Sequence, residues 1–193
     1  MTRGNLIIKN AAEVVTCSGS RAKCGREMSE LGVIPNGTVV IEQGIIRAVG
    51  TAQEVLADFD QTRYEVIDAA GKAVLPGFVD SHTHFVFGGY RAEEFSWRLR
   101  GDSYMEIMER GGGILSTVQA TREASREELL ASGRKRLDSM LAFGVTTVEG
   151  KSGYGLDDAT EIKQLEVMQA LDREHPIDVV RTFLGAHAVP PPY

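Results

Sequence analysis

The chain has 193 residues, is 42% hydrophobic and carries a formal net charge of −6 at pH 7. This length suits one ordinary domain or two small ones, and the hydrophobic content is normal for a soluble folded protein. A net negative charge argues against a general binder of nucleic acid, because such proteins usually carry a basic excess that neutralises phosphates. The expected partner is therefore a small molecule.

The N-terminus and the cysteines bear on the cellular compartment. The stretch "MTRGNLIIKNAAEVV" lacks the unbroken apolar core and the cleavage site of a signal peptide, and no apolar run reaches transmembrane length. Cys17 and Cys24 are separated by six residues, which fits neither a close-spaced zinc pair nor a disulfide framework. We expect a cytoplasmic protein with free thiols and no membrane contact.

The first third of the chain is rich in short β-type segments. Gln43 and Gly44 stand between two apolar β-branched runs and predict a hairpin turn. Residues 51–59 predict one short helix with Thr51 as its N-cap, and residues 17–37 are read as an irregular excursion. The strand-like runs are "NLIIKN", "AEVVT", "GTVVIEQGIIRAVG" and two within "YEVIDAAGKAVLPGFVD".

After Pro76, strands alternate with helices. A helix is predicted over residues 126–143, capped by Ser125 and closed by Gly144, and a second helix over 157–174. Apolar residues at helical spacing predict the buried stripes of the two helices: Leu129, Leu130, Leu137, Met140 and Leu141 in the first, and Ile162, Leu165, Met168 and Leu171 in the second. Strands are predicted near 74–84, 145–151 and 178–187.

This βαβαβ order implies a parallel sheet, either doubly wound or closed into a (β/α)8 barrel. No GxGxxG sequence follows any of the three strands, so the fingerprint of a dinucleotide-binding fold is missing. Both architectures place their chemistry at the carboxyl ends of the strands. Those ends carry side chains capable of chemistry: His82 and His84, then Lys151 and Tyr154, then His187.

His82 and His84 form a His-x-His pair at the end of the first of these strands. Alternate residues of a strand share a face, so the two Cα atoms are expected roughly 6.6 Å apart, with Thr83 on the opposite face. Two imidazoles at this separation can bind one metal ion, with Asp80 as a supporting carboxylate or a buried hydrogen-bonded group. The pair supplies only two of the three or four ligands required, so the pattern alone leaves a chance occurrence open.

Longer motifs resemble a known family. "PGFVDSHTH" resembles the first-strand signature of the amidohydrolase superfamily, whose members are metal-dependent hydrolases. Over essentially all of residues 1–193 the sequence is similar to the imidazolonepropionase family, most specifically in "GGGILSTV", "KSGYGL" and "GAHAVPP". The resemblance implies an α/β fold in which residues 1–75 form a small composite β domain of β-sandwich type. Residues 76–193 would then be the first portion of a (β/α)8 barrel, with about three βα units.

The resemblance also implies an activity, the hydrolytic opening of 4-imidazolone-5-propanoate to N-formimidoyl-L-glutamate in histidine degradation. His82 and His84 match the family's metal ligands, for one Zn²⁺ or Fe ion that would lower the pKa of a bound water. Arg91 matches the carboxylate-binding arginine, since a planar guanidinium suits a carboxylate.

Three further positions match substrate contacts of the family. Tyr154 and His187 do so most clearly, although His187 could instead be a metal ligand. Tyr104 could instead be a helix residue that packs its ring. His175 precedes a proline at a helix exit, is expected to be solvated and is assigned no role. Gly150 departs from the apolar residue usual in the family, which leaves the aim of Lys151 and Tyr154 open.

A (β/α)8 barrel takes about 250 residues, so residues 76–193 account for only part of one. The catalytic proton-transfer group and the remaining metal ligands are therefore unknown and are expected in a C-terminal part. The enzyme would be completed by that part or by homo-oligomerisation. Two alternatives stay open: an amidohydrolase acting on a different cyclic amide or amidine, and a non-catalytic half-barrel module that uses its open sheet edge for assembly.

Overall fold

The computed structural model describes residues 4–189, and contacts divide the chain into two compact units that meet between Pro76 and Gly77. In the described residues no helix is long and apolar enough to cross a membrane. Cys17 and Cys24 are both free and exposed.

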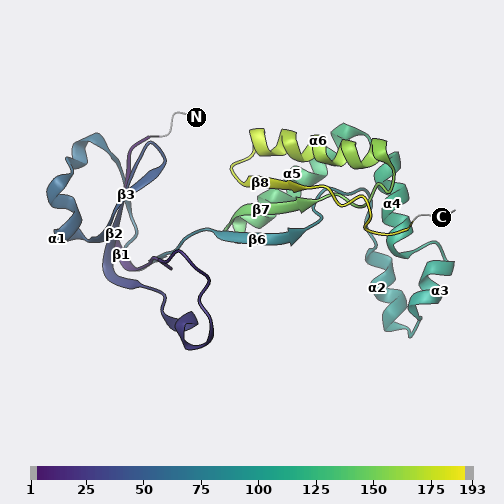
Figure 1. The fold of residues 1–193 in the computed structure, drawn as a ribbon, viewed down its shortest axis with the longest axis horizontal. Helices are drawn as coiled ribbons and strands as arrows, with labels where there is room; N and C mark the ends of the chain where they lie inside the picture. Colours follow the sequence, from purple (N-terminus) through teal and green to yellow (C-terminus); the bar gives the residue numbers. More distant parts are fainter. Residues whose placement is uncertain (1–3, 190–193) are drawn as a thin grey trace. The chain divides into compact units, whose positions relative to one another are not determined.

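The first unit is built on one mixed sheet (Figure 1). Its strands are β1 (Leu6–Val15), β2 (Val33–Glu42), β3 (Ile45–Thr51), β4 (Glu65–Asp68) and β5 (Ala73–Val74). The order β3-β2-β1-β4 is antiparallel from β1 to β3, while β4 and β5 pair parallel with β1. Two small apolar cores pack on it, one around Ala11, Val14, Val39 and Ala69 and one around Ile7, Val40 and Val55.

Local sequence signals account for several turns of this unit. Gln43 and Gly44 form the predicted hairpin turn, both with positive φ (51° and 80°), as a type I′ turn requires. Thr51 caps a helix in a reciprocal capping box with Glu54, but the predicted 51–59 helix is shorter. It is α1 (Ala52–Val55) followed by a 3-10 turn (Leu56–Asp58), and a second 3-10 turn covers Gln61–Arg63.

The strand predictions for residues 6–37 need two corrections. "NLIIKN" and "AEVVT" are one continuous strand, β1, with an irregular register between Ile8 and Ala11. The excursion ends at residue 32 rather than at residue 37, because β2 already starts at Val33, after a 3-10 turn at Gly25–Ser29. The start of β2 pairs with the second half of β1, so partner pairing overrides a Gly- and Pro-containing local sequence.

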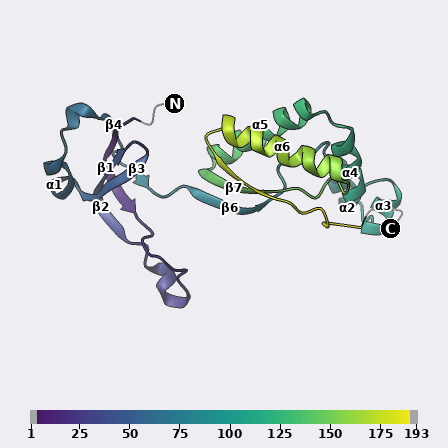
Figure 2. The same ribbon diagram turned by 45° about the horizontal axis from the view of Figure 1, so that its top comes forward.

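The second unit is a βαβαβ arrangement on a parallel sheet of order β6-β7-β8. Its strands are β6 (Phe78–Thr83), β7 (Val145–Lys151) and β8 (Asp178–Thr182), and its helices are α2 (Ala92–Leu99), α3 (Tyr104–Glu109), α4 (Gly113–Glu123), α5 (Arg126–Ala142) and α6 (Asp158–Glu174). Helices α5 and α6 cover one face of the sheet, and α2, α3 and α4 gather beyond the carboxyl ends of its strands (Figures 1 and 2). This is an α/β fold.

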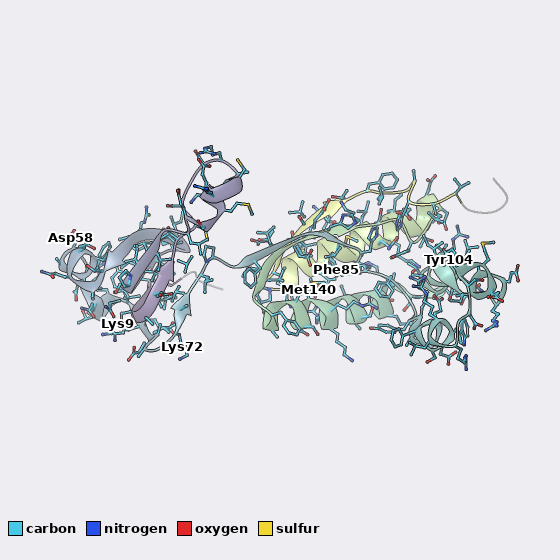
Figure 3. The ribbon with its side chains drawn as sticks, turned by 90° about the horizontal axis from the view of Figure 1, so that it is seen from below. Lys9, Asp58, Lys72, Phe85, Tyr104 and Met140 are labelled. Atoms are coloured by element: carbon cyan, nitrogen blue, oxygen red, sulfur yellow. The ribbon has the colours of Figure 1, made fainter. Side chains whose placement is uncertain are left out.

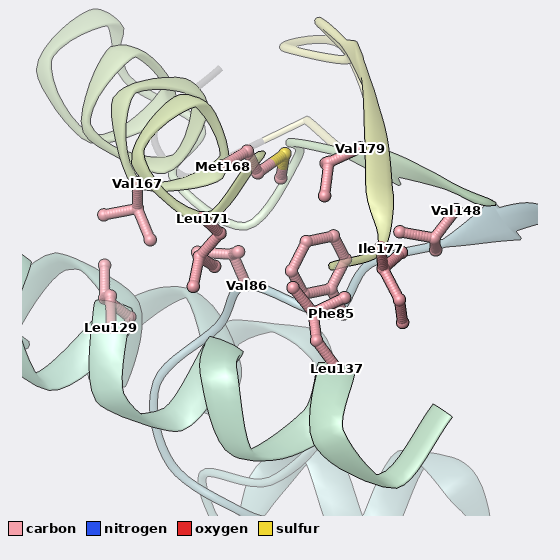
Figure 4. Packing of buried hydrophobic residues seen from close by; sticks show 10 residues of the cluster. All are labelled: Phe85, Val86, Leu129, Leu137, Val148, Val167, Met168, Leu171, Ile177 and Val179. Atoms are coloured by element: carbon pink, nitrogen blue, oxygen red, sulfur yellow. The ribbon is translucent and has the colours of Figure 1, made fainter. Parts of the chain in front are cut away.

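A single apolar core lies between this sheet and the two long helices (Figure 4). It is formed by Phe85, Val86, Leu129, Leu137, Val148, Val167, Met168, Leu171, Ile177 and Val179. Ser125 opens α5 in a capping box, Asp157 caps α6, and Gly144 follows α5 with φ +87°. The helix predictions are therefore confirmed to within a residue at each end.

Two positions of the predicted helix stripes are wrong. Leu141 and Ile162 are 37% and 53% exposed, whereas Leu137 and Met168 are fully buried. Both exposed residues lie at the border of their predicted stripe. Helical spacing defines a stripe, but the neighbouring elements decide how wide the buried part of it is.

The predicted strand boundaries at both ends of the unit also change. The run near 74–84 divides between two sheets, because Val74 pairs with Val14 in the first unit and β6 starts only at Phe78. The third strand ends at Thr182 rather than near 187, so His187 lies in a turn closed by its N–H bond to the Leu184 carbonyl.

Candidate functional site

The end of β6 presents the two histidines of the His-x-His pair. Their ring centroids are 6.1 Å apart with the rings tilted by 56°. His82 is exposed, and its backbone N–H donates to Asp80 Oδ1 at 3.3 Å. Between the two histidines, Thr83 Oγ1 donates to the Glu149 carbonyl oxygen at 2.7 Å and ties the strand end to β7.

His84 lies in a cluster of rings drawn from all three strand ends. It stacks on His187 with centroids 4.6 Å apart and planes 13° apart, and its centroid is 5.1 Å from that of Tyr154. Tyr154 and His187 are themselves 5.4 Å apart. The structure thus brings together three of the residues singled out from the sequence, although they are up to 103 positions apart in it (84 to 187).

Two features of His84 bear on metal binding. Burial, reinforced by the charge of His187, lowers the pKa of His84 below its usual range. This favours the neutral imidazole, the form that binds a metal ion. Its Nδ1 atom is buried and has no hydrogen-bond partner among the described residues. A ring nitrogen without a protein partner fits a ligand role.

The described residues offer only part of a metal site. No group of three or more His, Cys, Asp or Glu side chains between residues 4 and 189 is arranged to hold an ion. The donors His82 and His84 are of the imidazole type that suits zinc and iron alike. They fit such an ion as two members of a larger ligand set.

A cavity of about 300 Å³ opens beside the ring cluster. Its lining joins the segment after β6, helix α4 and the loop after β7, and consists of Phe87, Tyr90, Arg91, Thr117 and Tyr154. Arg91 and Tyr154, both singled out from the sequence, therefore share one cavity. Tyr104 is not part of this lining: it is the first residue of α3, is 52% exposed, and lies among the helices beyond the sheet (Figure 3).

Arg91 is oriented by a buried carboxylate. Glu94, 8% exposed, has Oε2 at 3.7 Å from Arg91 Nη1, while its Oε1 accepts the Gly113 N–H at 2.7 Å. A side chain on Gly112 would meet Glu94 Oε1 at 2.8 Å, which explains the glycine there. Glu94 thus joins the arginine to the start of α4, whose next turn carries Thr117.

The middle strand carries a polar group next to the histidines. The Glu149 carboxylate pairs with Lys151 Nζ and accepts a 2.7 Å bond from Thr182 Oγ1, and these hydrogen bonds hold the pKa of Glu149 below its usual range. Gly150 between them is buried, and a Cβ there would lie 2.7 Å from Phe85 Cε1. The glycine therefore allows the close approach of the residue that follows His84.

His175 corrects an expectation. Its side chain is only 3% exposed, not solvated. Nδ1 accepts the Ile177 N–H at 3.1 Å, and Nε2 lies 3.2 Å from Asp138 Oδ1 on α5. Because an accepting Nδ1 carries no proton, Nε2–H donates to the carboxylate. This histidine fastens the entry of β8 to α5, far from the ring cluster in the fold.

Several residues near the ring cluster escape detection from the sequence: Phe87, Glu94, Thr117, Glu161 and Gln164. The two glutamates look like ordinary acidic residues of a first helical turn, and the threonine like any helix residue. Only the tertiary contacts of each distinguish it from a solvated position.

The model of the amidohydrolase family matches residues 65–113. Imidazolonepropionases from Clostridium tetani and Parabacteroides distasonis are each 60% identical over 193 residues, which is 100% of this chain and 46% of theirs. One from a Geobacillus strain is 53% identical over 189 residues, 96% of this chain and 45% of its own. The chain thus spans somewhat less than half the length of these relatives.

Solved structures agree on the fold. Escherichia coli guanine deaminase superposes with a TM-score of 0.63 at 15% identity, covering 93% of this chain and 36% of that one. A triazine hydrolase from Arthobacter aurescens gives 0.62 at 18% identity, covering 93% and 35%. At such identities the likeness concerns the fold alone. By sequence, the chain is similar along its whole length to imidazolonepropionases and, over residues 65–113, to the amidohydrolase family.

Proposed function

We propose that this chain forms part of a metal-dependent hydrolase that opens the ring of 4-imidazolone-5-propanoate to N-formimidoyl-L-glutamate. The observation that carries the proposal is the shared cavity of Arg91 and Tyr154 beside the His84–His187 stack. A cation, a phenol and two imidazoles within one site suit a small ring that bears a carboxylate. The sequence identity of 53–60% to imidazolonepropionases supports the same substrate.

His82 and His84 are proposed as ligands of one Zn²⁺ or Fe ion. When bound, such an ion supplies Lewis acidity and lowers the pKa of a water molecule toward neutrality. The lowered pKa of His84 and its unpartnered Nδ1 support this role. The remaining ligands and the proton-transfer group would come from polypeptide that corresponds to the rest of the relatives' length.

The substrate would lie between the ring cluster and Arg91. Its carboxylate would accept hydrogen bonds from the guanidinium, which Glu94 holds at the wall of the cavity. The flat imidazolone ring would contact Tyr154 and His187. We propose Tyr104, which does not line the cavity, as a further substrate contact on the strength of the family resemblance alone.

The barrel interpretation is part of the proposal. The units β6 to β8 would be the first three strands of a (β/α)8 barrel, and residues 1–75 part of a composite β domain of β-sandwich type. Support comes from the uncovered apolar side chains of β6, of β8 and of the segment after it: Phe78, Val79, Val180 and Phe183 are 56–67% exposed. Further βα units, from a complementary polypeptide or from a second copy of this chain, would cover them.

The same exposed residues favour one second candidate, a non-catalytic module that uses this sheet for assembly. Such a module would not need Arg91 in the cavity. A hydrolase acting on a different cyclic amide or amidine would keep the metal ligands and likewise not depend on Arg91. The propionate is thus the group that distinguishes the three candidates.

The test is turnover of imidazolone propionate, followed by the loss of its ultraviolet absorbance. The purified chain is supplied with zinc, alone and together with a polypeptide that spans the remaining length of a relative. We expect turnover in the mixture that disappears with His82→Ala and keeps an unchanged KM with Arg98→Ala, an exposed arginine outside the cavity. Hydrolysis of other cyclic amides but not of this one would refute the substrate, and no turnover in either sample would refute the enzyme.

A further inference from the structure

The loop between β7 and α6, residues 152–157, carries Tyr154 and is held by a buried carboxylate. Glu161 is 2% exposed and lies in the first turn of α6. Its Oε2 accepts the Gly153 N–H at 2.7 Å, and its Oε1 accepts those of Gly155 at 2.7 Å and Leu156 at 2.9 Å. One carboxylate thus satisfies three backbone donors of a loop that has no strand or helix partner for them.

Capping of the helix does not explain this carboxylate. Asp157 is the N-cap of α6, and its Oδ1 accepts the Thr160 N–H at 2.8 Å. All three hydrogen bonds of Glu161 go instead to the loop that precedes the cap. The side chain of Glu161 therefore stabilises the conformation of the loop rather than the end of the helix.

The loop has a shape that needs such support. Leu156 has φ +53°, in the left-handed region that a non-glycine residue rarely adopts. Gly155 packs against the start of α6 so closely that a Cβ would lie 2.7 Å from the Glu161 nitrogen. A conformation of this kind persists only where the surrounding structure holds it. The hydrogen bonds from Leu156 and Gly155 to the carboxylate provide that hold.

The shape of the loop in turn sets the ring cluster. His187 Nδ1 lies 3.0 Å from the Gly153 carbonyl oxygen, which can only accept, so Nδ1–H donates to it. A Cβ on Gly153, whose φ is +114°, would collide with His187 Cβ at 2.7 Å. A second buried side chain, Gln164, accepts the Tyr154 N–H at 3.3 Å and donates to the Val86 carbonyl at 2.7 Å, two residues beyond His84.

We propose that Glu161 is the positioning residue of this site: its carboxylate fixes the loop so that Tyr154 and His187 meet at His84. All three hydrogen bonds of its carboxylate go to the backbone of residues 153–156, so it acts through that backbone. The inference deepens and rests on the proposed function, since it makes the presentation of Tyr154 and His187 to a ring-bearing substrate the purpose of the loop.

The test compares Glu161→Gln with Glu166→Gln, an exposed glutamate on the same helix, in the 193-residue chain. Amide hydrogen exchange and ring-proton shifts are measured by NMR. In the first variant we expect exchange at Gly153, Gly155 and Leu156 to accelerate about tenfold or more, because an amide replaces the charged acceptor. The ring protons of Tyr154 and His187 should shift, core amides should stay protected, and the control should match the unchanged chain.

Two results would overturn the inference. One is exchange at the three loop amides within twofold of the unchanged chain. The other is acceleration of all amides of the unit together, which would make Glu161 a residue of general stability. If the Gln variant does not fold, the unchanged chain decides the question. Hydrogen exchange at the three loop amides must then be slowed about tenfold or more, and unprotected exchange there would refute the role of Glu161.

Binding of imidazole-4-propanoate separates this inference from the proposed function. Its affinity for the unchanged chain should exceed that for Glu161→Gln by about tenfold, since the rings lose their alignment. No binding by the unchanged chain would count against the proposed function. The exchange pattern at the loop would still confirm or refute the role of Glu161.

Discussion

Replacing Arg91 by Ala should remove the preference of this chain for a carboxylate-bearing ring. The guanidinium is 39% exposed and lines the 300 Å³ cavity, and its Nη1 lies 3.7 Å from Glu94 Oε2, beyond hydrogen-bond distance. Donors of the guanidinium are then available to a ligand. A hydrogen bond to a charged group contributes about 1.5–3 kcal/mol, and solvent at this half-exposed position lowers the gain to the weaker end. That corresponds to a loss of about 10- to 20-fold in affinity.

The assay titrates the chain with imidazole-4-propanoate and with the matching propanamide, which keeps the ring and the chain length but has no charge. Arg91→Ala should lower the affinity for the carboxylate ligand by about 10- to 20-fold and the affinity for the amide by less than about threefold, because only the charged pair is lost. Arg98→Ala, on the exposed side of α2, is the matched control for the loss of one positive charge. Equal affinities of the unchanged chain for acid and amide, or an unaltered affinity of Arg91→Ala for the acid, would refute the role of this arginine.

Three further predictions concern the metal, the core and pH. Zinc binding, measured by competition with a chromophoric chelator, should be lost in the double variant H82A/H84A; stoichiometric zinc in that variant would rule out the β6 site. Leu137→Ala removes a fully buried side chain and should therefore lower the free energy of unfolding by about 3 kcal/mol and the melting temperature by roughly 10 °C. Leu141 is partly exposed, so Leu141→Ala should cost less than about 1 kcal/mol. Similar melting temperatures for these two variants would contradict the packing of α5. Hydrogen bonds from the backbone N–H and the hydroxyl of Ser125 lower the pKa of Glu128 in the folded chain. The ionised carboxylate therefore stabilises the fold above the pKa that Glu128 has in the unfolded chain. This stabilisation is lost as the pH falls through the pKa of the folded chain. Thermal melts of Glu128→Gln should therefore show less acid destabilisation than the unchanged chain, and parallel pH profiles would argue against this pKa shift.

Much of the fold is encoded in local sequence. Several signals act over only a few residues. They are the hairpin turn at Gln43-Gly44, the capping box begun by Ser125 and the glycine that ends α5, Gly144. Their effects can therefore be predicted without knowing any distant partner. The periodic apolar residues of α5 and α6 also predict which side of each helix is buried, with errors only at the borders of the stripes, as at Ile162.

Other features depended on contacts that no local pattern reports. Val74 belongs to the first sheet rather than to β6 because a distant strand, β1, pairs with it. The side chain of His175 is buried, with Nε2 3.2 Å from Oδ1 of Asp138 on α5.

The candidate site divides in the same way. His82, His84, Arg91, Tyr154 and His187 stand out in the sequence because their residue types and motifs are chemically distinctive. Their meeting in a ring cluster and one cavity is a property of parallel strands, whose carboxyl ends lie side by side however far apart they are in the chain. The carboxylates that hold this arrangement have no signature, because a buried Glu161 or Glu94 differs from a solvated glutamate only in the backbone amides that happen to face it. The sequence by itself therefore determined which groups could do chemistry, and the tertiary structure alone decided which of them meet and what keeps them in place, since hydrogen bonds and burial depend on neighbours in space rather than on neighbours in the chain.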